Sequence, residues 1–193
     1  MIEDLIAQNR SCRRFYQDHQ VDLETLKSLV NLGRMSASGA NLQPLKYIIS
    51  CDPSQNAKIF ACLAWAAYLK DWQGPEAGER PSAYIIVLAD TQVSKDAGCD
   101  HGIASQSILL GARDRGLGGC MIASINRETL RQHLDIAQQY KILLVLAIGK
   151  PKEEIVLDRV GPDGGIRYWR DENGVHHVPK RDLDEIIIHS YGS

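Results

Sequence analysis

Asn9-Arg10-Ser11-Cys12-Arg13-Arg14-Phe15 lies near the start of the chain and decides how the remaining sequence is interpreted. It carries three guanidinium groups and one hydroxyl, directly after a short helical pattern of apolar residues. An arginine presents a planar, permanently charged fork that matches the oxygens of a phosphate. Taken alone, the stretch is equally compatible with an ordinary solvated basic turn, so the rest of the chain has to separate the two interpretations.

The composition is that of a globular domain with an ordinary core. The chain has 193 residues, of which 44% are hydrophobic and 24% charged. A formal net charge of −2 gives no indication of a nucleic-acid or membrane partner. The longest apolar run, residues 142–148, is too short to span a bilayer.

Cysteine usage and the N-terminus indicate the compartment. The five cysteines are widely spaced and form no Cys-x-x-Cys pair, which argues against a disulfide framework and a zinc site. The first turn is acidic and lacks the apolar stretch of a signal peptide. We therefore expect a cytoplasmic protein.

Hydrophobic periodicity predicts alternating helices and strands. Asp22 should cap a helix that Gly33 ends, and Ser54 should cap a second helix whose apolar face extends to Leu69. A helix apolar on most sides is expected over residues 103–115, and Asn126 should cap another. Strands near residues 47, 85, 121 and 145 should form a central sheet with helices on both faces.

The C-terminal part has a different pattern. Asn173-Gly174 between residues 168–170 and 175–178 is a strong hairpin signal. His176 and His177 would then point to opposite faces of one strand, so they should not chelate a metal together.

Several well-known catalytic motifs are absent. The sequence contains no GxxxxGK[ST], GxGxxG, HExxH or GxSxG pattern. His101 beside Asp100 could be a general acid, but a capping role is favoured. A bound phosphate would have to be held by side chains, and Arg10, Arg13, Lys180 and Arg181 could converge on it.

Several stretches, in order, resemble the nitroreductase family of FMN-dependent oxidoreductases. Residues 10–15 resemble its Arg-Ser-x-Arg-x-Phe motif, and residues 37–44 resemble its Pro-Ser-x-x-Asn-x-Gln-Pro loop. Residues 102–120 resemble the central helix of the family's dimer core and the following turn, and Ile148-Gly149-Lys150-Pro151 resembles the end of its last core strand. No single motif is specific, but their common order is.

The resemblance implies an α+β, nitroreductase-like fold. We expect a single FMN-binding domain over residues 1–193, with a central, mostly antiparallel sheet flanked by helices. Two such chains would form an intertwined homodimer, in which a C-terminal arm of about residues 155–193 embraces the partner subunit.

The resemblance also implies a set of cofactor-binding residues. FMN would be bound by residues of the basic stretch, the small-residue loop, the segment after Cys120 and the C-terminal basic pair: Arg10, Ser11, Arg13, Ser38, Gly39, Asn41, Ile122, Ala123, Ser124, Lys180 and Arg181. Arg13 would lie beside the N1–C2=O edge of the flavin, and a backbone N–H of residues 122–124 would bond N5. No catalytic side chain and no metal are expected, because the flavin carries the chemistry.

The implied activity is hydride transfer from NADH or NADPH, through flavin N5, to a nitroaromatic, quinone or similar small acceptor. Both substrates would use one cleft in turn, which gives ping-pong kinetics. The choice of nicotinamide donor and the physiological acceptor stay open. Two alternatives remain: a flavin store or sensor with little turnover, and a specialised member that performs reductive dehalogenation or flavin destruction.

Overall fold

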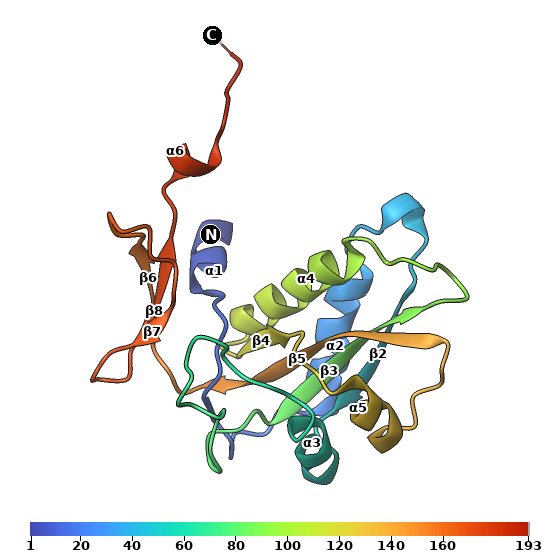
Figure 1. Ribbon diagram of the computed structural model, residues 1–193. Helices are drawn as coiled ribbons and strands as arrows, with labels where there is room; N and C mark the ends of the chain where they lie inside the picture. Colours follow the sequence, from blue (N-terminus) through green and yellow to red (C-terminus); the bar gives the residue numbers. More distant parts are fainter. Residues whose placement is uncertain (193) are drawn as a thin grey trace.

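The computed structural model describes residues 1–192 and is organised around an antiparallel sheet (Figure 1). Its strands are β1 (Phe15–Tyr16), β2 (Leu45–Ser50), β3 (Ala83–Asp90), β4 (Gly118–Ile122) and β5 (Tyr140–Pro151). β5 pairs with β1, β3 and β4, and β3 also pairs with β2, in every case antiparallel. The predicted α+β class and the four predicted strands are confirmed.

The central strand β3 explains why the sheet needs cover on both sides. All its residues are buried, and successive side chains of a strand point to opposite faces. Ile85 and Val87 belong to a core on one face, whereas Tyr84, Ile86 and Leu88 belong to a core on the other.

Helices supply that cover. They are α1 (Ile2–Gln8), α2 (Leu23–Arg34), α3 (Pro53–Phe60), α4 (Asp100–Asp114), α5 (Arg127–His133) and α6 (Leu183–Ile186), with a 3₁₀ turn at Gly39–Asn41. α2 and α4 contribute Leu26, Leu29 and Ile108 to one core, and α3 and α5 contribute Ile59 and Leu130 to the other. The expected placement of helices on both faces is therefore confirmed.

Local caps set several helix ends as predicted. The Asp22 carboxylate accepts a hydrogen bond from Thr25 N at 2.6 Å, and Asn126 Oδ1 accepts one from Thr129 N at 3.1 Å. Each bond satisfies one of the free N–H groups of a first helical turn.

The predicted helix from Ser54 to Leu69 is wrong at both ends. Asp52 is the N-cap and Pro53 the first helical residue of α3, which ends at Phe60. Beyond it, Leu63 forms a bridge with Ile125, and Ala64 N donates to Ser124 O at 3.0 Å. Pairing with a segment distant in the sequence thus replaces the next helical turn.

The helix α4 is not covered on all sides within one chain. Its side chains toward α2 and the sheet are buried, but Ile103 is 42% exposed. Within a single chain, α4 therefore keeps an exposed apolar side chain.

The C-terminal arm, residues 155–192, forms a separate small sheet. β8 (His176–Lys180) pairs in parallel with β6 (Ile155–Arg159) and antiparallel with β7 (Trp169–Arg170). Gly174 has φ = 80°, and Gly174 N donates to Asp171 O, so the predicted hairpin is confirmed. Figure 1 shows the arm beside α1, with α6 and the last residues leading away from the main sheet.

Two expectations about absent features can be compared with the structure. Across residues 1–192, no helix is long and apolar enough to cross a membrane. Within the same residues, no three His, Cys, Asp or Glu side chains are grouped so that they could hold a metal ion.

Candidate functional site

The basic stretch lies against the edge strand β4. Ser11 forms a bridge with Gly119, and Cys12 N donates to Gly119 O at 3.0 Å. A Cβ at Gly119 would lie 2.3 Å from Ala147 O, and one at Gly118 would lie 2.8 Å from Pro151 Cγ. Only glycine therefore lets the basic stretch and β5 approach β4 so closely.

Arg10 lies at the end of α1 beside a cavity of about 200 Å³ that Arg113 and Gly118 also line. Its Nη2 donates to Ile6 O at 2.8 Å, whereas its buried Nε has no partner among the described residues. Burial lowers the pKa of Arg10 from its usual value. A buried donor without a partner is costly, so this guanidinium can accept an anionic ligand, in a cavity that Glu153 and Glu154 also line.

Arg13 and Arg14 have different environments. Arg14 forms a fork with the Glu79 carboxylate at 2.5 and 2.6 Å, and Lys152 adds a contact of 3.0 Å to the same carboxylate. The Arg14 hydrogen bond and Lys152 lower the pKa of Glu79 to about 2, so the pair stays ionised. Arg13 instead lies 5.0 Å from the Tyr168 ring centroid and donates to Ser11 O. Arg14 is thus occupied by protein groups, and Arg13 has no carboxylate partner among the residues described.

Glu153 holds the backbone of the basic stretch in place. Its Oε1 accepts hydrogen bonds from the amides of Arg13 and Arg14, and its Oε2 accepts one from Arg170 Nη2 at 2.9 Å. The side chain is completely buried. This carboxylate therefore ties the basic stretch to strand β7 of the C-terminal arm.

The small-residue loop is anchored on Asp100, the first residue of α4. Ser38 Oγ donates to Asp100 Oδ2 at 2.6 Å, and Gly39 N donates to Oδ1 at 2.9 Å. Gln43 N in turn donates to Ser38 Oγ at 2.9 Å. Ala40 and Asn41 have φ of 48° and 56°, so the loop holds its turn with left-handed residues, and Gly39 and Asn41 are exposed.

Residues 122–124 follow the same edge strand that the basic stretch touches. Ile122 is buried at the end of β4, while Ala123 and Ser124 are exposed. Ala123 O accepts a hydrogen bond from Arg127 Nη2 at 3.2 Å, and Ser124 O accepts one from Ala64 N at 3.0 Å. These bonds fix the direction of the backbone where the resemblance places the N5 contact.

The C-terminal basic pair lies at the far end of β8. Lys180 is exposed and bonds Val160 N through its carbonyl, and Arg181 is 3.9 Å from Glu185. Neither Lys180 nor Arg181 is among the residues that line the cavity beside Arg10. Their convergence with Arg10 and Arg13 on one phosphate stays a prediction.

Apart from Lys180 and Arg181 at the end of β8, the predicted site residues form two groups. The basic stretch and residues 122–124 share β4, whereas Ser38, Gly39 and Asn41 lie at the start of α4. Arg113, which lines the Arg10 cavity, is on the last turn of α4. A helix rises about 1.5 Å per residue, so roughly 20 Å of helix separates the two groups.

The residues that hold these segments escaped the sequence analysis. Glu153, Glu79 and Asp100 occur in no motif, and their partners are distant in the chain. For Asp100 the sequence offers one signal, an acidic residue three positions before the predicted helix of residues 103–115.

The family model of the nitroreductase family matches residues 6–150. The 5,6-dimethylbenzimidazole synthase of Rhodospirillum rubrum is 26% identical over 182 residues, covering 79% of this chain and 83% of the relative. MhqN of Bacillus subtilis, a candidate NAD(P)H nitroreductase, is 22% identical over 191 residues. The match covers 78% of this chain and 88% of that relative.

Solved structures show the same fold. An FMN-dependent nitroreductase of Clostridium difficile superposes with a TM-score of 0.66 at 22% identity, covering 80% of this chain and 89% of that one. A nitroreductase family protein of Streptococcus pneumoniae superposes with a TM-score of 0.69 at 16% identity. The match covers 98% of this chain and 100% of that one. The family model spans most of the chain and the antiparallel α+β architecture agrees with it, so this protein belongs to the nitroreductase family.

Proposed function

We propose that this protein is an FMN-dependent oxidoreductase that uses NADH or NADPH to reduce a nitroaromatic, quinone or similar small acceptor. The observation that carries the proposal is Arg10, whose buried Nε lacks a partner beside a cavity at the basic stretch. Bound FMN would supply the chemistry by accepting a hydride and passing it on. The printed names of two relatives, which refer to NAD(P)H and FMN, support this choice.

The chain's own residues would bind and orient the cofactor. Arg10 and Ser11 would hold the phosphate, with each charge-assisted hydrogen bond contributing about 1.5–3 kcal/mol. Arg13, which has no carboxylate partner among residues 1–192, would place a positive charge at the flavin edge. The backbone of residues 122–124, whose carbonyls are already engaged, would present its N–H groups to N5.

A second copy of the chain would complete the site. Ser38, Gly39 and Asn41 lie at the opposite end of α4 from Arg10, and Lys180 and Arg181 lie at the end of the arm. We therefore propose an intertwined homodimer in which the arm and the small-residue loop of one chain reach the basic stretch of the other. The exposed apolar residues of α4 and the arm supply the surface that such an association buries.

No side chain is proposed as nucleophile or general acid. Burial raises the pKa of the Cys12 thiol, and burial likewise raises the pKa of Cys120 to about 12. Both thiols therefore stay protonated at neutral pH and are poor nucleophiles. Because the cysteines are free, we also propose a reducing, cytoplasmic location.

The test is the visible spectrum of the purified protein, recorded anaerobically before and after adding NADH or NADPH. Flavin bands near one FMN per chain that bleach with a nicotinamide, with ping-pong kinetics toward a quinone, are expected. Arg10→Ala should release FMN, whereas Arg159→Ala, an exposed arginine on the arm, should retain it. Flavin bands that no nicotinamide bleaches would support a store or sensor, and a colourless protein that FMN cannot reconstitute would contradict the proposal.

A second candidate function is synthesis of 5,6-dimethylbenzimidazole, which the name of the Rhodospirillum rubrum relative favours. That product contains the same dimethylated benzene ring as the flavin, so this candidate corresponds to the flavin-destroying alternative. Incubation of the reduced holoprotein with oxygen, followed by chromatography, separates the two. Stoichiometric loss of flavin with appearance of the benzimidazole would favour the second candidate, and an intact flavin over many turnovers would favour the first.

A further inference from the structure

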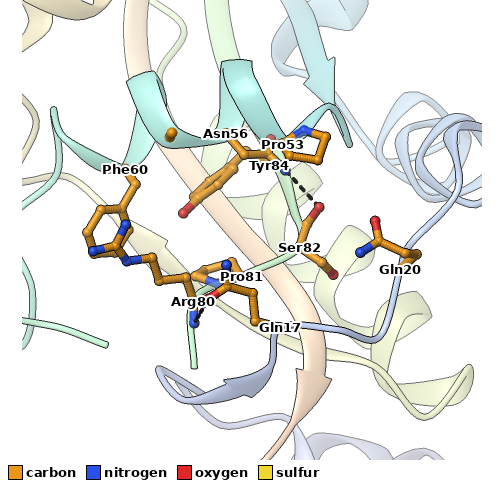
Figure 2. A pocket seen from close by; sticks show the side chains of 10 residues that line it. Gln17, Gln20, Pro53, Asn56, Phe60, Arg80, Pro81, Ser82 and Tyr84 are labelled. Carbon is orange, nitrogen blue, oxygen red and sulfur yellow. Dashed lines mark hydrogen bonds between the residues drawn. The ribbon is translucent and has the colours of Figure 1, made fainter. Parts of the chain in front are cut away.

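A cavity of about 100 Å³ lies between α3, the start of β3 and the loop before it (Figure 2). Its walls combine apolar and polar side chains, including Phe60, Arg80, Ser82 and Tyr84. None of its lining residues is among those predicted to bind FMN. The cavity is therefore a separate feature of the fold.

Two buried hydroxyl groups in this cavity have no hydrogen-bond partner among the described residues. Tyr84 is 1% exposed and Ser82 is 6% exposed, and neither Tyr84 OH nor Ser82 Oγ is bonded. Figure 2 shows the Tyr84 hydroxyl pointing toward the space between Phe60 and Arg80. Burying an unbonded hydroxyl is unfavourable, so these groups need a ligand or solvent as partner.

Arg80 adds an uncompensated positive charge. Its guanidinium lies 4.2 Å from the Phe60 ring centroid, and its buried Nε has no partner. The cavity lining contains no carboxylate, and Arg80 forms no ion pair within residues 1–192. Burial raises the pKa of Tyr84, so its hydroxyl remains a donor at neutral pH.

The acceptor atoms of the nearby amides are already engaged. Gln17 Oε1 accepts hydrogen bonds from Gly78 N at 2.8 Å and Arg80 N at 3.2 Å. Asn56 Oδ1 accepts one from Ser50 Oγ, and Asn56 Nδ2 donates to Ser82 O, both at 2.8 Å. These bonds hold the walls in place. Apart from the amide of Gln20, the polar side-chain groups of the lining without a partner among the described residues include the donors of Arg80, Tyr84 and Ser82.

We propose that this cavity is a binding site for a small oxyanion, a carboxylate or a phosphate, held by Arg80 and Tyr84, which face the same space in Figure 2. Such an anion accepts hydrogen bonds from both side chains and neutralises the guanidinium. The volume admits several water molecules or one such anion, and Phe60 and Pro81 could contact a short aliphatic group. Neutral water would satisfy the hydroxyls but would leave the charge of Arg80 uncompensated.

The test is thermal unfolding of the FMN-loaded protein in increasing sodium phosphate or sodium acetate, balanced with sodium chloride to constant ionic strength. A ligand that binds only the native state raises the midpoint in a saturable way. Side-chain NMR of the Arg80 Nε–H group, followed in the same titrations, locates the site. Saturation by one of the two anions, with a matching shift of the Arg80 signal, is expected and identifies which oxyanion binds.

Three variants make the assignment specific. Arg80→Gln should raise the dissociation constant of the anion at least tenfold. Tyr84→Phe, which keeps the ring, should raise it about three- to tenfold. Lys58→Gln, an equal change of charge at an exposed position of α3, should leave it unchanged. Stabilisation no greater than that of chloride, or an effect that survives Arg80→Gln and Tyr84→Phe but is lost in Arg10→Ala, would overturn the proposal.

Discussion

The main sheet with its helices and the C-terminal arm are stabilised in different ways. Up to residue 151 the chain buries two apolar cores, whereas in residues 155–192 the buried residue is the polar His176. The arm instead exposes large apolar side chains, such as Ile188 at 84% and Tyr191 at 95%. The first region is stabilised by buried apolar side chains, whereas the second leaves large apolar side chains exposed within a single chain.

What joins the two regions is polar. Glu153 bonds the basic stretch and Arg170, and the ring of Tyr168 packs on Arg13 and against His176 at 5.3 Å. Buried polar contacts of this kind contribute less net stability than an apolar core but depend strongly on correct geometry. The following predictions test this difference, beginning with the largest effect.

Ile148→Ala should be the most destabilising change. Ile148 is completely buried in β5, so truncation removes apolar contacts and leaves a cavity, at a cost of about 2–5 kcal/mol. Urea unfolding measures this. The matched control Ile188→Ala should change unfolding by less than about 0.5 kcal/mol at protein concentrations where the chain is monomeric. Equal losses for both variants would contradict the distinction between the two regions.

Glu153→Gln should lower the free energy of unfolding by about 2–4 kcal/mol, because it weakens the contact between the basic stretch and the arm. The change leaves Arg170 without its carboxylate in a buried position. Glu154→Gln is the matched control, because Glu154 is the next residue in the chain and is exposed. Chemical unfolding gives the free energy, and faster amide exchange in β8 would show that the arm separates from the sheet. If both variants behave like wild type, Glu153 does not hold the junction.

His176 should make stability depend on pH. Burial lowers the pKa of His176 to about 4, helped by Arg13 and Arg170 and opposed by Glu153. Between about pH 4 and the usual value of 6.5, the unfolded chain therefore binds more protons than the folded one. Stability should fall as the pH is lowered through this window, by at most about 3 kcal/mol.

Urea unfolding at several pH values between 7 and the acid limit of the fold measures that slope. His176→Gln should flatten it, because the variant does not titrate there. A wild-type slope that this substitution leaves unchanged would assign the pH dependence to other groups.

Trp169→Ala should have the smallest effect and lower the stability of the arm by about 0.5–1.5 kcal/mol. Trp169 is 45% exposed and stacks on His177 with a centroid distance of 4.6 Å and an interplanar angle of 6°. Hydrogen exchange of the β8 amides should increase while that of β3 stays constant. Tyr191→Ala, at an almost fully exposed position, should change neither. Increased exchange in β3 would mean that the arm and the sheet unfold together.

Much of the fold follows from local patterns. Short runs such as Ala83–Asp90, rich in β-branched residues and with an almost entirely apolar sequence, are typical of buried strands. Asp22 and Asn126 cap helices through bonds three residues away, and Gly174 provides the positive φ of the hairpin. Such interactions involve neighbours along the chain, so the residue types alone indicate them.

Tertiary structure decided the features that depend on distant partners. α3 stops at Phe60 because residues 63–64 pair with residues 124–125, and no pattern within the helix announces this. Glu153, Glu79 and Asp100 acquire their roles only when the fold brings them to the basic stretch and the small-residue loop. The cavity beside Arg80 and Tyr84 likewise combines residues from three separate stretches of the chain.

The predicted cofactor residues show where the two kinds of information meet. The order of the motifs along the chain was sufficient to indicate the family, because each motif is a contiguous stretch. The positions of the motifs relative to one another in space could not be predicted in this way. The structure shows that the small-residue loop and the Arg10 cavity lie at opposite ends of α4. The sequence by itself thus determined the elements and the family of this protein, and the packing of those elements decided this separation of the loop from the cavity.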